Sequence, residues 1–170
     1  DVLVNNAGVF FPHPIDEVSY EDWQQAWADT LGVNLVGAAN VTWCAVRHIP
    51  RDGSGRIVNV GSRGAFRGEP DSPAYGASKA AIAAFGQSIA KSLGATGIAV
   101  STVAPGFVET EMAGEHLEGE LGDATRAQSP FNRVATPEEI AAAVVWLASP
   151  EAQWASGAIL DLNGASYLRM

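Results

Sequence analysis

The chain has 170 residues, of which 47% are hydrophobic and 17% charged, and its 19 acidic against 10 basic side chains give a formal net charge of −9. This size suits one domain with a sizeable core. The acidic balance argues against nucleic acid or an anionic membrane as a partner, and no apolar run approaches the ~20 residues that span a bilayer. With Cys44 as its single cysteine, the chain has no intramolecular disulfide and no cysteine-rich metal site. We expect a soluble, cytoplasmic protein.

The first residues have the pattern of a strand. Asp1 is followed directly by the apolar residues 2–4 and then by the polar turn 5–8. An apolar β-rich run indicates a buried strand, and its place at the first residue predicts that strands of the same sheet lie upstream. We therefore expect a fold that is incomplete at its N-terminus.

A long helix is predicted from about residue 19 to residue 49. Ser19 with Asp22 three residues later is a capping signal. The pattern continues past Gly32, where we expect a kink, and residues 33–46 include no charged side chain. A helix without a charged face is covered on most sides.

The next predicted elements are a strand at 56–60, a helix that begins at Pro73, and a strand at 98–103. Ser72 is the expected N-cap of this helix, with proline at the first helical position. Residues 80–90 are uncharged and rich in alanine and glycine. Two uncharged helices in one small domain suggest a subunit interface, so we expect a homo-oligomer, a dimer or tetramer.

Residues 107–130 are acidic with no clean period, and we interpret them as a lid over the substrate. A capping box at Thr136 and Glu139 predicts a helix that runs to about residue 148, before a last strand at 158–162. Strands that alternate with helices indicate an α/β fold, a doubly wound parallel sheet of the Rossmann type, in a single domain that spans residues 1–170.

Tyr75 and Lys79 are four residues apart, one turn along the helix that Pro73 begins. Residues at this spacing share a helix face. A cation nearby lowers the pKa of an acid by roughly 1 to 3 units, and the positive helix N-terminus acts in the same direction. Tyr75 could then exchange protons near neutral pH. The alternative is a pair of surface residues at a chance spacing.

With these elements placed, the chain resembles the short-chain dehydrogenase/reductase family over nearly its whole length. Residues 5–8 read Asn-Asn-Ala-Gly, Ser62 stands 13 positions before Tyr75, and Asn34 lies in a Val-Asn-Leu helix segment. Residues 104–110 most resemble the β-ketoacyl carrier-protein reductase type. The resemblance makes the chain the C-terminal two-thirds of such a Rossmann fold. The cofactor-binding residues that it implies are Asn6, Ala7, Gly8, Tyr75, Lys79, Pro105, Gly106, Val108 and Thr110.

The resemblance implies hydride transfer between NAD or NADP and a small carbonyl or alcohol substrate. Ser62 and Tyr75 would donate to the carbonyl oxygen as negative charge grows there. Tyr75 would transfer the proton, Lys79 would lower its pKa and bind the nicotinamide ribose, and Asn34 would hold a water that connects Lys79 to solvent.

Each of these residues also has a simpler interpretation. Ser62 is suited to a turn at a strand end, and Asn34 to a helix kink or a buried cap. Asn6 could brace neighbouring strands, and Thr110 could be the N-cap of a lid helix. The histidines, which lack the spacing of metal ligands, are interpreted as structural or solvated. These are His13, His48 and His116.

Two points stay open from the sequence. Arg63 and Arg67 flank a catalytic candidate and could meet an anionic group of a substrate, or belong to a solvated loop. No Gly-x-Gly-x-x-Gly occurs in the 170 residues, although this turn cradles the pyrophosphate in dinucleotide folds. The alternative function is therefore a non-catalytic, oligomerising chain that does not bind dinucleotide.

Overall fold

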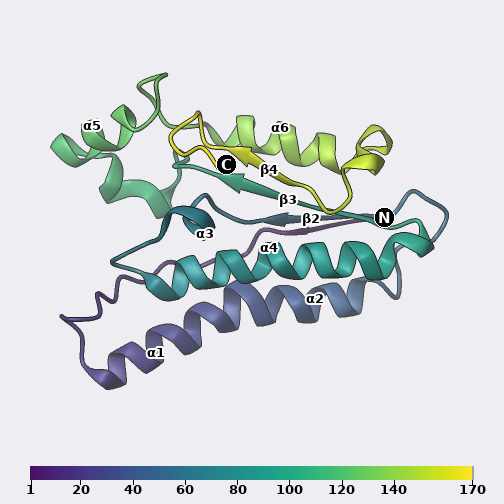
Figure 1. Cartoon of the computed structure of the whole chain (residues 1–170), viewed down its shortest axis with the longest axis horizontal. Helices are drawn as coiled ribbons and strands as arrows, with labels where there is room; N and C mark the ends of the chain where they lie inside the picture. Colours follow the sequence, from purple (N-terminus) through teal and green to yellow (C-terminus); the bar gives the residue numbers. More distant parts are fainter. Residues whose placement is uncertain (170) are drawn as a thin grey trace.

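The computed structural model describes residues 1–169, apart from the side chain of Glu115. Its sheet has four parallel strands in the order β1 (Val2–Asn5), β2 (Arg56–Val60), β3 (Ala99–Pro105) and β4 (Ile159–Leu162). Helices α1 (Tyr20–Leu31), α2 (Ala38–Ala45) and α4 (Pro73–Leu93) lie on one side of the sheet, and α6 (Pro137–Leu147) lies on the other (Figure 1). The predicted doubly wound parallel sheet is confirmed.

The core forms on both faces of the central strands. All seven residues of β3 are buried, as expected for a parallel strand that helices cover on both sides. Ile57, Ile98 and Val100 pack with the end of α4 on one face, whereas Val58 and Val103 pack with Leu147 of α6 on the other. This double burial holds the carboxyl ends of the strands in one rigid edge.

A π-helical turn interrupts the long N-terminal helix. It spans Gly32–Gly37 between α1 and α2 and buries Asn34 to 3% exposure. The helix is therefore irregular where the sequence predicts a kink, and such turns occur often at functional sites. The helix ends at Ala45 rather than at about residue 49, because the chain turns there and places Ile49 in the core.

Two of the three predicted helix caps are confirmed. Ser19 Oγ accepts from Asp22 N at 3.1 Å, and Thr136 and Glu139 form the reciprocal capping box of α6. At α4, Ser72 holds the predicted N-cap position and Pro73 begins the helix, but the side-chain cap bond is not formed. The Ser72 hydroxyl donates to Phe11 O at 3.2 Å instead of capping the helix.

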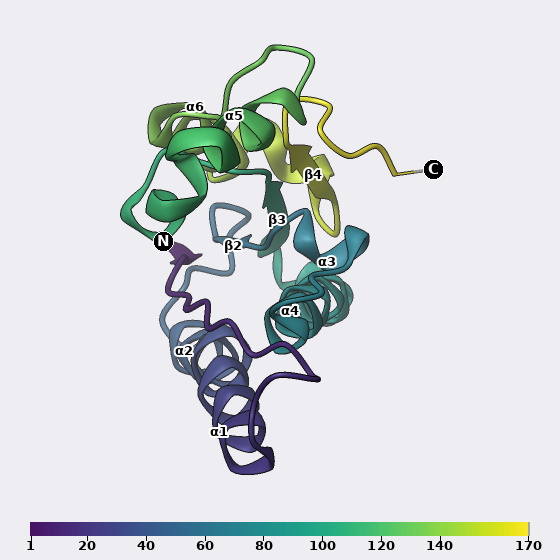
Figure 2. The same cartoon turned by 90° about the vertical axis from the view of Figure 1, so that its left-hand side faces the viewer.

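Several short elements have no clear signal in the sequence. Helix α3 (Gly64–Arg67) lies in the loop before α4, and a 3-10 helix spans Pro150–Ala155. Within residues 107–130, a 3-10 helix (Glu111–Leu117) is followed by α5 (Gly119–Ala127). Helix α5 lies on the α6 side of the sheet, beyond the carboxyl ends of the strands (Figures 1 and 2). No helix of the described part of the chain is long and apolar enough to cross a membrane.

Candidate active site

The carboxyl ends of the parallel strands bring three separate segments of the chain together. Beyond β2, Gly61 N donates to Val103 O at 2.8 Å and Arg63 N donates to Pro105 O at 2.8 Å. Beyond β3, Gly106 N donates to Leu162 O at 3.1 Å. Ser62 therefore lies beside the turn at 105–106, at the edge where open α/β sheets bind ligands.

Helix α4 carries Tyr75 and Lys79 to this edge on one face. The Lys79 Nζ atom lies 5.6 Å from the centre of the Tyr75 ring and donates to Val60 O, the last residue of β2, at 3.0 Å. Lys79 is only 5% exposed. The predicted shared face is confirmed, and the ammonium reaches inward to the strand end.

Asn34 and Gly8 lie next to the lysine. The Asn34 amide accepts from Val9 N at 2.8 Å and donates to Val9 O and to Ser78 Oγ, each at 3.0 Å. A Cβ atom at Gly8 would lie 3.4 Å from Lys79 Nζ and 3.6 Å from Asn34 Oδ1. The structure thus places Gly8, Asn34 and Lys79 in one cluster. Asn34 also lies in the π-helical turn, where the sequence predicts a kink.

Burial controls the ionisation of the central pair. It raises the pKa of Tyr75 from its ordinary value near 10, an effect that the Ser62 hydroxyl partly offsets and that the negative charge of Glu69 reinforces. Burial also lowers the pKa of Lys79 to about 8. The expectation that the pKa of Tyr75 is lowered is therefore wrong for the protein alone, because loss of hydration is the largest cause of the shift.

In the segment of residues 5–8, the asparagine that contacts neighbouring elements is not the one that the sequence suggested. The side chain that braces neighbouring elements is that of Asn5, which donates to Asn59 Oδ1 at 2.8 Å and to Thr42 Oγ1 at 2.9 Å. Asn6 and Ala7, by contrast, are exposed. The bracing that the sequence suggested for Asn6 thus belongs to its neighbour.

The loop of residues 105–110 is tied to the segment before α6. Val108 forms a parallel bridge with Ala135, and Glu109 N donates to Ala135 O at 2.9 Å. Thr110 is exposed, and its hydroxyl makes a long contact of 3.4 Å with Val108 O. It directly precedes the 3-10 helix (Glu111–Leu117), consistent with its alternative interpretation at a helix start.

The aromatic side chains that surround Tyr75 are not part of the sequence motifs. Phe10 packs edge-on against the Tyr75 ring at 5.0 Å between centroids. His116 packs against Phe10 at 6.1 Å and against Phe107 at 5.8 Å. His116 therefore links the segment interpreted as a lid to the tyrosine through Phe10. The sequence signal for Phe10 was the apolar run of residues 9–11.

Comparison with known proteins identifies the family. The family described as Enoyl-(Acyl carrier protein) reductase matches residues 1–164. The 3-oxoacyl-(acyl-carrier-protein) reductase FabG of Vibrio cholerae is 38% identical over 168 residues, 99% of this chain and 67% of that protein. The chain belongs to the short-chain dehydrogenase/reductase family. Another relative, an acetoacetyl-CoA reductase from Acinetobacter, is 36% identical over 99% of this chain and 66% of its own length.

Solved structures of the family agree with this assignment. A short-chain dehydrogenase/reductase from Brucella melitensis has a TM-score of 0.90 and 32% identity, and the matched region covers 99% of this chain and 66% of the Brucella chain. A gluconate 5-dehydrogenase from Burkholderia cenocepacia, in complex with NADP and tartrate, has a TM-score of 0.89 and 29% identity over the same shares. The chain thus spans about two thirds of the length of its relatives. The expected cofactor class, NAD or NADP, agrees with these structures.

Proposed function

We propose that this chain carries the catalytic residues of an NAD- or NADP-dependent oxidoreductase that interconverts a carbonyl and an alcohol. The observation that carries the proposal is the convergence of Tyr75, Lys79, Asn34 and Gly8 at the carboxyl edge of the sheet. The Ser62 hydroxyl acts to lower the pKa of Tyr75 against the effect of burial, which supports its inclusion in this group.

Tyr75 is the acid and base of the proposed reaction. The bound nicotinamide would supply or accept the hydride. As negative charge grows on the substrate oxygen, the hydroxyls of Tyr75 and Ser62 donate to it and lower the barrier. A raised pKa keeps the phenol protonated at neutral pH, so that it has a proton to donate in the direction of reduction.

Lys79 stabilises the tyrosinate that remains after the proton is donated. Its ammonium lies near the Tyr75 ring and beside Gly8, and an opposite charge at this range favours the ionised phenol. The Asn34 side chain is held in place by its bonds to Val9 and Ser78. In the proposed mechanism Asn34 holds the water through which Lys79 exchanges protons with solvent.

The residues present fit the nicotinamide end of a dinucleotide. The missing side chain at Gly8 leaves room beside Lys79 Nζ, and the turn at 105–106 lies at the same edge of the sheet. Tyr75 and Lys79 would hold the ribose. The remaining contacts are proposed for Asn6, Ala7, Gly8, Pro105, Gly106, Val108 and Thr110.

The proposed substrate is a small carbonyl or alcohol compound, and residues 107–130 are proposed to cover it. The contacts of His116 with Phe10 and Phe107 support this role, since they bring the segment to the tyrosine. The names of the relatives span carrier-bound, coenzyme A-bound and sugar-acid substrates. For this chain we propose only the shared reaction.

Replacement of Tyr75 by phenylalanine tests the mechanism in the protein as its gene encodes it. We expect kcat for any accepted carbonyl to fall by about 10²- to 10⁴-fold, the usual contribution of a positioned acid. Binding of NADH or NADPH, followed by its fluorescence, should change little. The matched control is Tyr20→Phe, at a tyrosine that is 69% exposed on α1.

Two results would count against the proposal. Full turnover in Tyr75→Phe would exclude Tyr75 as the proton donor. A wild-type protein that changes neither NADH nor NADPH fluorescence would favour the alternative, a non-catalytic oligomerising chain.

A further inference from the structure

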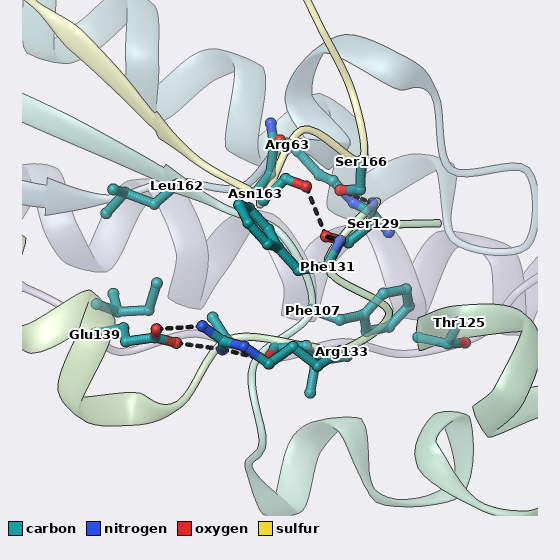
Figure 3. Close-up of a pocket in the computed structure, with 14 residues that line it drawn as sticks. Arg63, Phe107, Thr125, Ser129, Phe131, Arg133, Glu139, Leu162, Asn163 and Ser166 are labelled. Carbon is teal, nitrogen blue, oxygen red and sulfur yellow. Dashed lines mark hydrogen bonds and ion pairs between the residues drawn. The ribbon is translucent and has the colours of Figure 1, made fainter. Parts of the chain in front are cut away.

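Arg63 follows Ser62 directly and is buried to 3% exposure (Figure 3). Buried arginine side chains are rare unless an acid pairs with them. Burial lowers the pKa of Arg63 to about 10, and the nearby charge of Arg67 acts in the same direction, whereas the charge of Glu69 opposes the shift. Because the pKa is lowered on balance, the surroundings compensate the positive charge of Arg63 only in part.

The contacts of Arg63 are to neutral groups. Its Nη1 donates to Ser166 Oγ, and its Nη2 donates to Gln128 Oε1 at 2.6 Å. Among the side chains that the structure describes, no carboxylate lies within ion-pair distance of it, and Glu69 is bound to Arg67 at 3.1 Å. Since a guanidinium has five N–H donors, these two bonds leave donors for a further acceptor.

Arg63 lines a cavity of about 200 Å³. One water occupies roughly 30 Å³ of liquid, so the cavity has room for a small molecule. Its wall includes the hydroxyls of Thr125, Ser129 and Ser166 and the apolar side chains of Phe131 and Leu162 (Figure 3). Ile140 of α6 also lines it.

The acid in the cavity wall is already neutralised. Glu139 receives two bonds from Arg133, at 2.6 and 2.8 Å, and the two side chains lie together in Figure 3. These interactions hold the pKa of Glu139 at about 2. The charge that faces this cavity without a partner among the described side chains is therefore that of Arg63.

The cavity is separate from the cluster around Tyr75. The Arg63 guanidinium lies 5.0 Å from the centre of the Phe107 ring, and Phe107 also packs against His116. Neither Tyr75 nor Lys79 lines the cavity. Phe107 thus stands between the cavity and the aromatic group that contacts the tyrosine.

We propose that this cavity binds a small anion, a carboxylate or phosphate group, through Arg63. The planar guanidinium suits bidentate contact with either group, and its position on an aromatic ring leaves its edge for such contact. The hydroxyl of Thr125 supplies a further donor, whereas that of Ser129 already donates to Gly164 O. The anion is either part of the substrate or a separate small ion, and both would use the same residues.

A thermal-shift experiment tests the binding. We expect phosphate and malonate to raise the Tm of the protein in a saturable way, compared with chloride at equal ionic strength. Arg63→Gln should abolish the shift, whereas the matched control Arg51→Gln, at an exposed loop arginine, should keep it. An equal shift in Arg63→Gln, or none in wild type, would overturn the proposal.

A second variant covers the case in which Arg63→Gln does not fold. Ile140→Phe leaves the arginine in place and fills the cavity from α6, so it should weaken phosphate binding at least tenfold. Binding equal to that of wild type would contradict a site in this cavity.

Measurements of KM distinguish whether the anion is part of the substrate or a separate ion. This experiment rests on the proposed oxidoreductase function. If the anion is part of the substrate, Arg63→Gln raises KM for an oxo acid and leaves KM for its neutral amide unchanged. If the anion is a separate ion, the two KM values respond alike while the thermal shift is lost. The thermal-shift result stands whether or not turnover is found.

Discussion

Lys79 is buried at the centre of the candidate site without a carboxylate to compensate it among the described ion pairs. Its ammonium donates to a strand-end carbonyl, Val60 O, and its pKa is lowered to about 8 by loss of hydration. The fold therefore bears the cost of an ionised amine in its interior at neutral pH. Such costs are typical of functional sites.

The pH dependence of stability provides a test of this cost. Between its folded pKa of about 8 and its ordinary value of 10.5, Lys79 binds fewer protons in the folded than in the unfolded state, so its contribution to stability rises with pH. We expect the free energy of unfolding of wild type, minus that of Lys79→Met, to increase by about 2 kcal/mol from pH 7 to pH 10. Urea denaturation measures it. A difference that stays constant would mean that Lys79 is hydrated.

The identities of the candidate catalytic residues could be predicted, whereas their ionisation could not. Tyr75 and Lys79 are close because helix geometry fixes the direction of residues four apart. The direction of the Tyr75 pKa shift depends instead on how deeply Phe10 and the strand ends bury the phenol. That depth arises from segments far apart in the sequence, which local spacing does not report.

At the scale of elements, the start of α4 depends on a histidine from a distant loop. His13 is 1% exposed, and its Nε2 accepts from Ala74 N at 3.2 Å. Its Nδ1 then carries the proton and donates to Phe11 O at 2.6 Å. His13 therefore satisfies a free N–H group in the first turn of the helix that carries Tyr75.

Replacement of this histidine should disturb both stability and turnover. His13→Leu leaves the Ala74 N–H buried without an acceptor, and we expect a loss of about 1 to 3 kcal/mol in the free energy of unfolding. As Tyr75 lies one residue further on, kcat should fall more than KM changes. His13→Gln, whose amide oxygen can replace Nε2 as acceptor, should recover most of both losses. Equal damage from the two variants would show that His13 acts by its volume alone.

The two kinds of helix start explain which caps could be predicted. Thr136 and Glu139 satisfy each other within one turn, so their spacing in the sequence contains the whole interaction. At the start of α4, the loop of residues 11–13 replaces the local cap. The Ser72 hydroxyl donates to Phe11 O of that loop instead of accepting from the helix. A cap that depends on a long-range contact has no signature in the local sequence.

At the scale of the whole molecule, the regular elements follow from hydrophobic patterns and the short ones do not. Alternating strands and helices led directly to the parallel sheet, because helices cover both faces of its central strands β2 and β3, whereas β1, predicted to be buried, is partly exposed. Helices α3 and α5 are short or polar, and α5 packs mainly beside the 3-10 helix that precedes it. Their form depends on contacts with loops, so the segment 107–130 gave no periodic signal.

The exposed face of the first helical segment predicts how copies of the chain associate. Val33, Val36 and Trp43 lie on one side of the π-helical turn and α2, with 38%, 50% and 61% of their surfaces exposed. Trp43 stands seven residues, about two helical turns, after Val36. A continuous apolar stripe on an uncharged helix is typical of an interface, and in a symmetric assembly the same stripe serves both copies.

We therefore expect the protein to form a homo-oligomer through this stripe and to lose that contact when a charge is introduced into it. Trp43→Glu should lower the mass measured by light scattering to that of a smaller species, since two like charges would be buried face to face. Ile15→Glu, at an apolar residue 73% exposed in the loop before α1, is the control and should leave the mass unchanged. An unchanged mass for Trp43→Glu would place any subunit contact on another face. A wild-type protein that is monomeric would exclude the interface, and the exposed stripe would then need another partner.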